Sequence, residues 1–328
     1  MAINRAHPAS TGASALEHII AANVLSQTPD LAHQYQSAKP FRHVVMDGFF
    51  DPAFSQRLVD EFPAFDPALA MNENGEVGAK CSHDDLCALG GVWQDIDAMI
   101  QTPDFLHWLG ALTGIPKLLY DPHYFGGGTH ENRHGQDLDP HVDFNRHPIT
   151  GWHRRLNLIV YLNDDWSPEW GGAIEFHKDP RLPADQNQIE LVQPMLNRAV
   201  VFETTHWSWH GFERINLPQG DQDPRSRKSL ALYFYSVDRP VEEQTKPHST
   251  IYVERPLPPH IQPGITLSDA DHETLLRLLA RRDQHLQRLY GYISDLNQQL
   301  EDSRSHLPMG LLRRIRAKLG RLYRRLMG

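Results

Sequence analysis

The chain has very few cysteines and no long apolar run, and each shortage excludes a class of protein. Only Cys81 and Cys87 occur among 328 residues, and five residues separate them. That spacing is not typical of a zinc site, and two cysteines build no disulfide framework, so we expect a reducing, cytoplasmic setting. No apolar run approaches the length of a membrane span, and the first residues lack the apolar segment of a secretory leader.

Basic residues are scarce except near the C-terminus. From Ser303 onward there are eight Lys or Arg and no Asp or Glu, so the remainder holds 24 basic against 41 acidic residues, a net charge of −17 beneath the overall −9. The net negative charge of residues 1–302 disfavours binding to the phosphate backbone of nucleic acids, so we expect no nucleic-acid partner. The basic end places Leu312, Ile315 and Leu319 on one face, which predicts an amphipathic helix that either packs on the acidic body or makes peripheral membrane contact.

Histidine is abundant, with 20 residues, and one arrangement of them stands out. In a strand, residues two apart project to the same face, so His141 and Asp143 can bind one metal together. His210 follows the apolar run 199–202, which is typical of a buried strand. Two imidazoles and one carboxylate hold Fe(II) on one face and leave three positions open. The sequence therefore predicts a metal centre at His141, Asp143 and His210.

A basic cluster opens the next apolar run, 229–235. Arg227 and Ser229 share one face of the expected strand, as two donors to one carboxylate should. Arginine fits this role because its planar fork binds carboxylates bidentately. The preceding loop is long and polar, so Arg225 and Lys228 remain alternatives to Arg227.

The stretch from Tyr120 to Tyr235 resembles the prolyl-4-hydroxylase-like branch of the Fe(II)/2-oxoglutarate dioxygenases, with a closer similarity to the subgroup of ribosomal-protein prolyl hydroxylases. Besides the histidine–aspartate pair, segments 155–166 and 169–176 are similar to the core hairpin of that family. Val200-Val201-Phe202, with His210 eight residues past the phenylalanine, matches its second histidine strand, and 41–52 resembles its opening strand and helix. The resemblance covers roughly residues 40–240.

The resemblance implies a mainly β fold with flanking helices, in which residues 15–254 form a double-stranded β-helix (jelly-roll or cupin-like) core. Arg227 would bind the distal carboxylate of 2-oxoglutarate, assisted by Tyr161 on the facing strand and by Ser229. Asn157 alternates onto the same strand face as Arg155 and Tyr161, so we expect it in the pocket. The implied catalytic residues are His141, Asp143, His210 and Arg227. The implied cofactors are Fe(II), 2-oxoglutarate and O2, with ascorbate a further candidate.

The implied reaction is hydroxylation of an unactivated C–H bond, coupled to decarboxylation of 2-oxoglutarate to succinate. Asp143 favours hydroxylation over halogenation, because related halogenases replace this carboxylate with a small residue. The substrate stays open between a prolyl residue in a protein, a free amino acid, a sugar and a lipid-linked precursor. Two rival hypotheses are a cupin-type metalloenzyme that needs no 2-oxoglutarate and a non-catalytic scaffold that oligomerises through its C-terminal helices.

Local patterns divide the chain further. We expect disorder at 1–14, helices at 15–26 and 52–62 (the latter capped by Asp51), and a loop at 64–90 that is either a lid or a surface connection. Trp207 and Trp209, on either side of His210, are expected to pack in the core.

A Pro-rich linker at 255–267 leads to a helical segment at 268–328. Ser268 and Asp271 form a capping-box-like pair at its start. The heptad pattern predicts a coiled coil through 268–302 that either joins copies of the chain into a homo-oligomer or folds back on the catalytic domain. Its positions are Leu275, Leu279, Leu286, Leu289, Ile293, Leu296 and Leu300.

Overall fold

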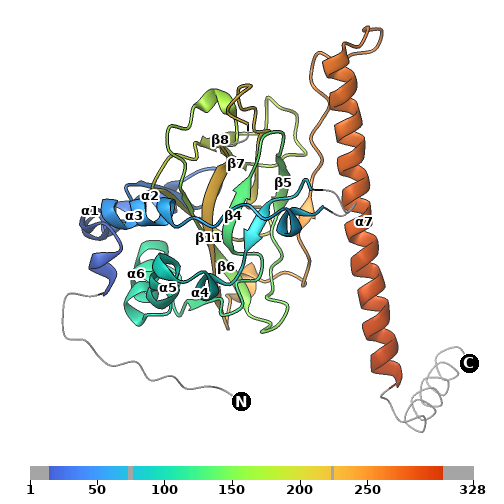
Figure 1. Ribbon diagram of the computed structural model, residues 1–328. Coiled ribbons are helices and arrows are strands. Elements are labelled where there is room, and N and C mark those ends of the chain that lie inside the picture. The colour runs from blue at the N-terminus through green and yellow to red at the C-terminus, as the bar shows by residue number, and fades with distance from the viewer. Residues whose placement is uncertain (1–14, 73–76, 223–224, 306–328) are drawn as a thin grey trace, which may run out of the picture. The chain divides into compact units, whose positions relative to one another are not determined.

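A computed structural model describes residues 15–72, 77–222 and 225–305 (Figure 1). The chain divides into two compact units, Met1–Pro256 and Leu257–Gly328. The predictions of disorder at 1–14 and of a basic amphipathic helix at the C-terminal end lie outside the described residues. Within the described ranges, no helix has both the length and the apolar character needed to cross a membrane.

The first unit is built on two antiparallel sheets, as the jelly-roll prediction requires. The larger sheet has the order β1-β9-β6-β11-β4-β2, with β3 paired to β11, and the smaller has the order β12-β5-β10-β7-β8. The strands of the larger sheet are β1 (His43–Asp47), β2 (Cys81–His83), β3 (Leu119–Tyr120), β4 (Gly128–Asn132), β6 (His153–Tyr161), β9 (Arg198–Glu203) and β11 (Arg227–Ser236). Those of the smaller sheet are β5 (Leu138–Val142), β7 (Ile174–His177), β8 (Ile189–Val192), β10 (Trp209–Phe212) and β12 (Ile251–Tyr252). Both sheets end in open edges, so the described strands form no closed barrel.

Apolar side chains on both faces hold the larger sheet in place. Alternate residues of β6 such as Leu156, Leu158 and Val160 join the core shared with the helices. On the opposite face, Tyr161 and Phe202 pack with Phe176 and Ile174 of the smaller sheet. Because the central strands are buried on both sides, the side chains that they project between the sheets have a fixed position.

Six short helices lie together on one side of the larger sheet (Figure 1). They are α1 (Ala22–Ser26), α2 (Thr28–Ser37), α3 (Pro52–Asp60), α4 (Leu86–Leu89), α5 (Gly91–Ile100) and α6 (Pro103–Thr113). Asp51 caps α3 as predicted, because its carboxylate accepts from the amides of Ala53 and Phe54. The prediction of a single helix at 15–26 is wrong. A 3₁₀ turn, Ala15–His18, is separated from α1 because Ile20 forms a β-bridge with Phe50.

The expectation that 64–90 is only a loop is also wrong. This stretch contains a 3₁₀ turn (Pro67–Ala70), the strand β2 and the helix α4. Its three-residue strand is too short and polar to show an alternating pattern, and its pairing with β4 is what makes it a strand. The pairing places Ser82 opposite His130, at the edge of the larger sheet.

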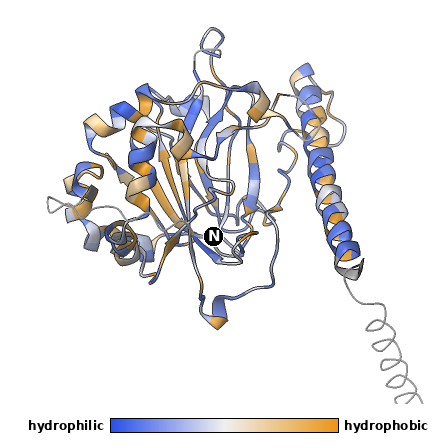
Figure 2. Cartoon of the chain, turned by 60° about the horizontal axis from the view of Figure 1, so that its bottom comes forward, coloured by the Kyte–Doolittle hydropathy of each residue, from blue (hydrophilic) through white to orange (hydrophobic). Residues whose placement is uncertain are grey.

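The second unit contains one long helix, α7 (Asp269–Ser305). Ser268 and Asp271 form the predicted capping box: the Ser268 hydroxyl accepts from the Asp271 amide at 3.2 Å, and the Asp271 carboxylate accepts from the Ser268 amide at 2.9 Å. Apolar residues recur along the helix (Figure 2). Several heptad residues are exposed, namely Leu279, Leu286, Leu289, Ile293, Leu296 and Leu300.

Candidate metal centre

Two neighbouring strands of the smaller sheet bring the three proposed ligands together. His141 in β5 lies directly opposite His210 in β10, with ring centroids 4.2 Å apart. Asp143 follows β5, and its carboxylate oxygens lie 3.8 Å from Nε2 of His141 and 3.6 Å from Nε2 of His210. The three side chains are buried, and one donor atom from each lies within 4.8 Å of the others. One ion can therefore bind all three.

A glycine allows this close approach of the two strands. A Cβ atom on Gly211 would lie 2.5 Å from the carbonyl oxygen of Leu138 in β5. The strand register shifts between His210 and Phe212, so the irregularity starts immediately after the histidine pair. A larger residue at Gly211 would force β10 away from β5 and separate the imidazoles.

Each imidazole is oriented by its own backbone. Nδ1 of His141 lies 2.9 Å from the carbonyl oxygen of Asp139, and Nδ1 of His210 lies 2.9 Å from that of Ser208. Donation from Nδ1 leaves Nε2 free as a ligand. Burial, with the neighbouring His210, lowers the pKa of His141 to about 3, and burial also lowers the pKa of His210. Both rings are therefore neutral near pH 7, which metal binding requires.

Asp143 is held by two side chains from β6. Its Oδ2 accepts from the Asn157 amide at 2.8 Å and lies 3.2 Å from the guanidinium of Arg154. Arg154 also donates to Oδ1 of Asn157 at 2.8 and 3.1 Å, so the three groups form a closed network. Burial alone would raise the pKa of Asp143, but Arg154, the two histidines and Asn157 lower it well below its usual range. The carboxylate is thus ionised and oriented before any ion binds.

Arg154 projects toward Asp143, although simple strand alternation predicts that Arg155 lies on this face. The register of β6 against β11 shifts, so that Phe234 pairs with Leu156 and Tyr235 pairs with Arg154, which leaves Arg155 unpaired as a bulge residue. The expectation that Arg155 faces the pocket with Asn157 is therefore wrong. Its guanidinium instead lies 3.3 Å from the carboxylate of Glu243.

Arg227, the first residue of β11, is a buried cation beside this centre. Its Nε donates to the carbonyl oxygen of Gly172 at 2.7 Å, and its guanidinium lies 3.3 Å from the hydroxyl of Tyr161. The rings of Phe212 and Tyr161 lie 4.3 and 5.0 Å from the guanidinium carbon. Within the described residues no carboxylate pairs with it. An uncompensated buried charge is costly, so the site suits an anionic ligand that supplies the missing partner.

The two alternatives to Arg227 point elsewhere. Arg225 donates to the carbonyl oxygen of Asp164 at 3.2 Å and stacks 4.6 Å from the ring of Trp170. Lys228 projects to the opposite face of the sheet, where its amine lies 5.2 Å from the ring of Phe62. Ser229 is buried in β11 directly opposite Tyr161. The residues expected to bind the cosubstrate, Arg227, Tyr161 and Ser229, therefore lie together. The side chain of Asn157 instead contacts Asp143.

Both tryptophans beside His210 were predicted to pack in the core, and only one of them does. Trp209 is buried, as predicted, and Arg181 stacks 4.2 Å from its ring. Trp207 is 46% exposed, so the prediction that it packs in the core is wrong. The turn that precedes β10 carries it to the surface.

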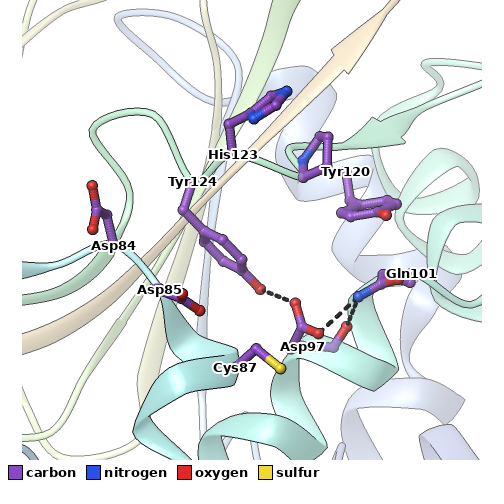
Figure 3. Close-up of a pocket in the computed structure, with 9 residues that line it drawn as sticks. Asp84, Asp85, Cys87, Asp97, Gln101, Tyr120, His123 and Tyr124 are labelled. Carbon is purple, nitrogen blue, oxygen red and sulfur yellow. Dashed lines mark hydrogen bonds between the residues drawn. The ribbon is translucent and has the colours of Figure 1, made fainter. Parts of the chain in front are cut away.

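A separate cavity of about 340 Å³ lies beside α4 and α5 (Figure 3). In Figure 3, Tyr124 and Gln101 point at Asp97, and their hydrogen bonds to its carboxylate measure 2.8 and 2.9 Å. Asp85 caps α4 by accepting from the amide of Ala88. These carboxylates already have intramolecular partners, and the cavity contains none of the proposed metal ligands.

The metal centre fits ferrous iron by its donor chemistry. Two neutral imidazoles and one ionised carboxylate, with both imidazoles oriented by hydrogen bonds, are the ligand set of non-haem Fe(II) oxygenases. The donor atoms of His141, Asp143 and His210 lie close enough together to hold one ion.

A family model agrees with this chemistry. Residues 127–235 match the family model of the 2OG-Fe(II) oxygenase superfamily. No protein with a curated description matches the chain. Similar solved structures include a prolyl 4-hydroxylase from Phytophthora capsici (18% identity, 86% of this chain and 77% of that one, TM-score 0.43). Others are a prolyl-4-hydroxylase from Pseudomonas putida (17% identity, 63% and 100%, TM-score 0.39) and HygX from Streptomyces hygroscopicus with nickel and 2-oxoglutarate bound (12% identity, 63% and 91%, TM-score 0.38).

The matched segment contains His141, Asp143, His210 and Arg227, so the family model and the geometry point to the same residues. Residues 127–235 therefore carry the sequence pattern of the 2OG-Fe(II) oxygenase superfamily, together with a side-chain geometry that suits ferrous iron.

Proposed function

We propose that this enzyme hydroxylates an unactivated C–H bond and couples that reaction to decarboxylation of 2-oxoglutarate to succinate and CO2. The observation that carries the proposal is the buried Arg227, which has no carboxylate partner among the described residues and stacks 4.3 Å from Phe212, two residues after His210 in β10. A five-carbon diacid can supply that carboxylate at one end and bind a metal at the other.

The chain's own residues bind and orient the reacting groups. His141, Asp143 and His210 would hold Fe(II), and Arg154 and Asn157 keep Asp143 in place. When bound, iron and 2-oxoglutarate would activate O2, the oxidant, with one oxygen atom going to the substrate and the other to succinate; this chemistry belongs to the cofactors rather than to the protein.

The cosubstrate pocket has its own set of residues. Arg227, Tyr161 and Ser229 lie on one face of β11 and β6 and would receive the distal carboxylate of 2-oxoglutarate. Phe212 lies beside the guanidinium and helps to exclude water, which strengthens a charge pair there. The substrate that we propose is a prolyl residue or a small molecule, since the sequence resemblance favours the prolyl-hydroxylase-like branch.

An iron-dependent succinate assay on the purified full chain tests this proposal. We expect succinate formation that requires Fe(II), O2 and 2-oxoglutarate, and we expect Asp143→Ala to abolish it when iron is limiting. His107→Ala, at an exposed position on α6, is the matched control and should behave as the wild type. Normal succinate formation by Asp143→Ala would contradict the assignment.

The same assay separates the proposal from both rival hypotheses. A cupin-type metalloenzyme would turn over its own substrate with a bound metal, would be indifferent to added 2-oxoglutarate and would form no succinate. A scaffold that has lost catalysis would form no succinate with any metal.

We also propose that α7 joins two copies of the chain. Leu286, Ile293 and Leu300 occupy one heptad position and are exposed, with Leu289 and Leu296 at the other apolar position. Light scattering should give the mass of a dimer, and Leu286→Glu with Ile293→Glu should give a monomer that keeps its succinate activity. A monomeric wild type would contradict the proposal.

A further inference from the structure

A lysine lies at the edge of the larger sheet, where only β4 separates β2 from β11, the strand that carries Arg227. Lys80 directly precedes β2, and its amine lies 2.9 Å from Nε2 of His130 and 3.4 Å from the carbonyl oxygen of Gly126. His130 belongs to β4 and pairs with Ser229 of β11, two residues from Arg227. The lysine therefore reaches the same sheet face that carries the proposed cosubstrate residues.

The surroundings of this amine link it to the proposed iron ligands. The Tyr233 hydroxyl donates to the same Gly126 carbonyl at 3.0 Å, and its ring lies 3.7 Å from the guanidinium carbon of Arg154, which binds Asp143. Desolvation of the amine lowers the pKa of Lys80 to about 8, with Arg154 acting in the same direction and Asp143 opposing it. Lys80 thus lies within electrostatic reach of the metal centre.

Lys80 forms no ion pair in the part of the chain that the structure describes. The residue as a whole is exposed, and desolvation acts on its amine end, which contacts His130 and the carbonyl oxygen of Gly126. Beside it, the Ser82 hydroxyl is buried without a hydrogen-bond partner among the described groups, and Ser82 lies directly opposite His130. A cation, an imidazole and a hydroxyl therefore share one edge of the pocket. On the other sheet, the ring of Tyr252 lies 5.1 Å from that of His141.

We propose that Lys80, His130 and Ser82 form a subsite for an anionic group, a carboxylate or a phosphate, on the molecule that is hydroxylated at the iron. The inference rests on the proposed function, because it needs a substrate bound beside the metal centre. Arg227 is committed to the cosubstrate and Arg154 to Asp143, whereas Lys80 is a cation that neither of these roles uses. Asp143 does not oppose an anion there, because its charge is balanced by Arg154 and the metal.

The test uses the full chain loaded with Mn(II) and 2-oxoglutarate, so that ligands bind without turnover. Calorimetry first measures 2-oxoglutarate binding. Inorganic phosphate and acetate are then titrated separately, and the paramagnetic relaxation of the phosphorus or methyl nuclei reports anions that bind close to Mn(II). We expect saturable enhancement with at least one of the two anions. Phosphate alone, acetate alone or both would each support the subsite and would identify the anionic group.

The variants assign the effect to the lysine. Lys80→Met should weaken anion binding about tenfold or more, as expected for loss of a charge-assisted hydrogen bond. Lys80→Arg should bind within about threefold of the wild type, and His130→Gln should weaken binding less than Lys80→Met does. Lys117→Met, at an exposed position after α6, is the control and removes the same charge. Circular dichroism checks that each variant is folded.

The outcomes separate this inference from the proposed function. If 2-oxoglutarate binds normally but neither anion binds, or if Lys80→Met binds them as the wild type does, the subsite is wrong and the dioxygenase proposal stands. If 2-oxoglutarate itself fails to bind the Mn(II) protein, the proposed function fails and the subsite fails with it.

Discussion

Replacing Arg227 with methionine should remove 2-oxoglutarate binding while leaving the fold and the metal centre intact. Methionine keeps the length and the apolar stem of arginine but removes the charge and the donors. The lost interaction is a charge pair in a buried pocket, flanked by Phe212 and Tyr161. Loss of one partner in such a pair costs about 2–5 kcal/mol. The Kd for 2-oxoglutarate should therefore rise by about 30-fold to several thousand-fold.

The same substitution should have little effect on the stability of the cofactor-free protein. Arg227 loses its hydrogen bonds to Gly172 and Tyr161, which contribute about 1–3 kcal/mol each. Removal of a buried cation without a carboxylate partner offsets this by about 1–4 kcal/mol. At the midpoints of these ranges the two opposing effects leave a net loss of about 1–2 kcal/mol in the free energy of unfolding.

Calorimetry on the Mn(II)-loaded protein measures the binding, and denaturant unfolding measures the stability. Arg225→Met and Lys228→Met are matched controls, since each removes one positive charge from a neighbouring residue that contacts other groups. Both should bind 2-oxoglutarate as the wild type does. If Arg225→Met or Lys228→Met loses binding while Arg227→Met keeps it, the account of the cosubstrate pocket is refuted.

Three further predictions follow from the site. Asn157→Leu removes the amide that binds Asp143, so the Mn(II) affinity measured by calorimetry should fall about 10- to 100-fold; an unchanged affinity would show that Asn157 does not support the ligand. Gly172→Ala places a Cβ atom 3.1 Å from Cδ of Arg227, at a residue whose φ is +74°. The strained backbone should lower the free energy of unfolding by about 1–2 kcal/mol. The displaced Arg227 should bind 2-oxoglutarate more weakly, while the metal affinity stays unchanged. Because the pKa of Lys80 is lowered to about 8, its acetylation by acetic anhydride, followed by peptide mass spectrometry, should reach half its maximum near that pH. A lysine model peptide, with a pKa of about 10.4, provides the reference, and an identical pH profile for Lys80 would contradict the shift.

The sequence was sufficient to predict that His141, Asp143 and His210 lie together, because each signal was local. His141 and Asp143 follow the two-residue period of a strand, and the run before His210 has the composition of a buried strand. Arg227 was preferred over Arg225 and Lys228 by its register with the following strand, and the contacts of all three agree with that preference.

Features that depend on strand pairing could not be predicted in the same way. Arg154 reaches Asp143 because a bulge at Arg155 changes the alternation of β6, and no residue type in that segment announces a bulge. Lys80 lies beside the pocket because a three-residue polar strand pairs with β4. Such short strands are defined by their partner strands rather than by their own periodicity.

The most direct test of the central claim is an anaerobic titration of Fe(II) and then 2-oxoglutarate into the purified chain, followed by visible absorption. A keto acid chelated to ferrous iron absorbs visible light by charge transfer, whereas either component alone does not. We predict that this absorption saturates at one iron and one 2-oxoglutarate per chain and is absent in Asp143→Ala. A wild-type protein that shows no such absorption, or an Asp143→Ala protein that shows it at full intensity, would contradict the account.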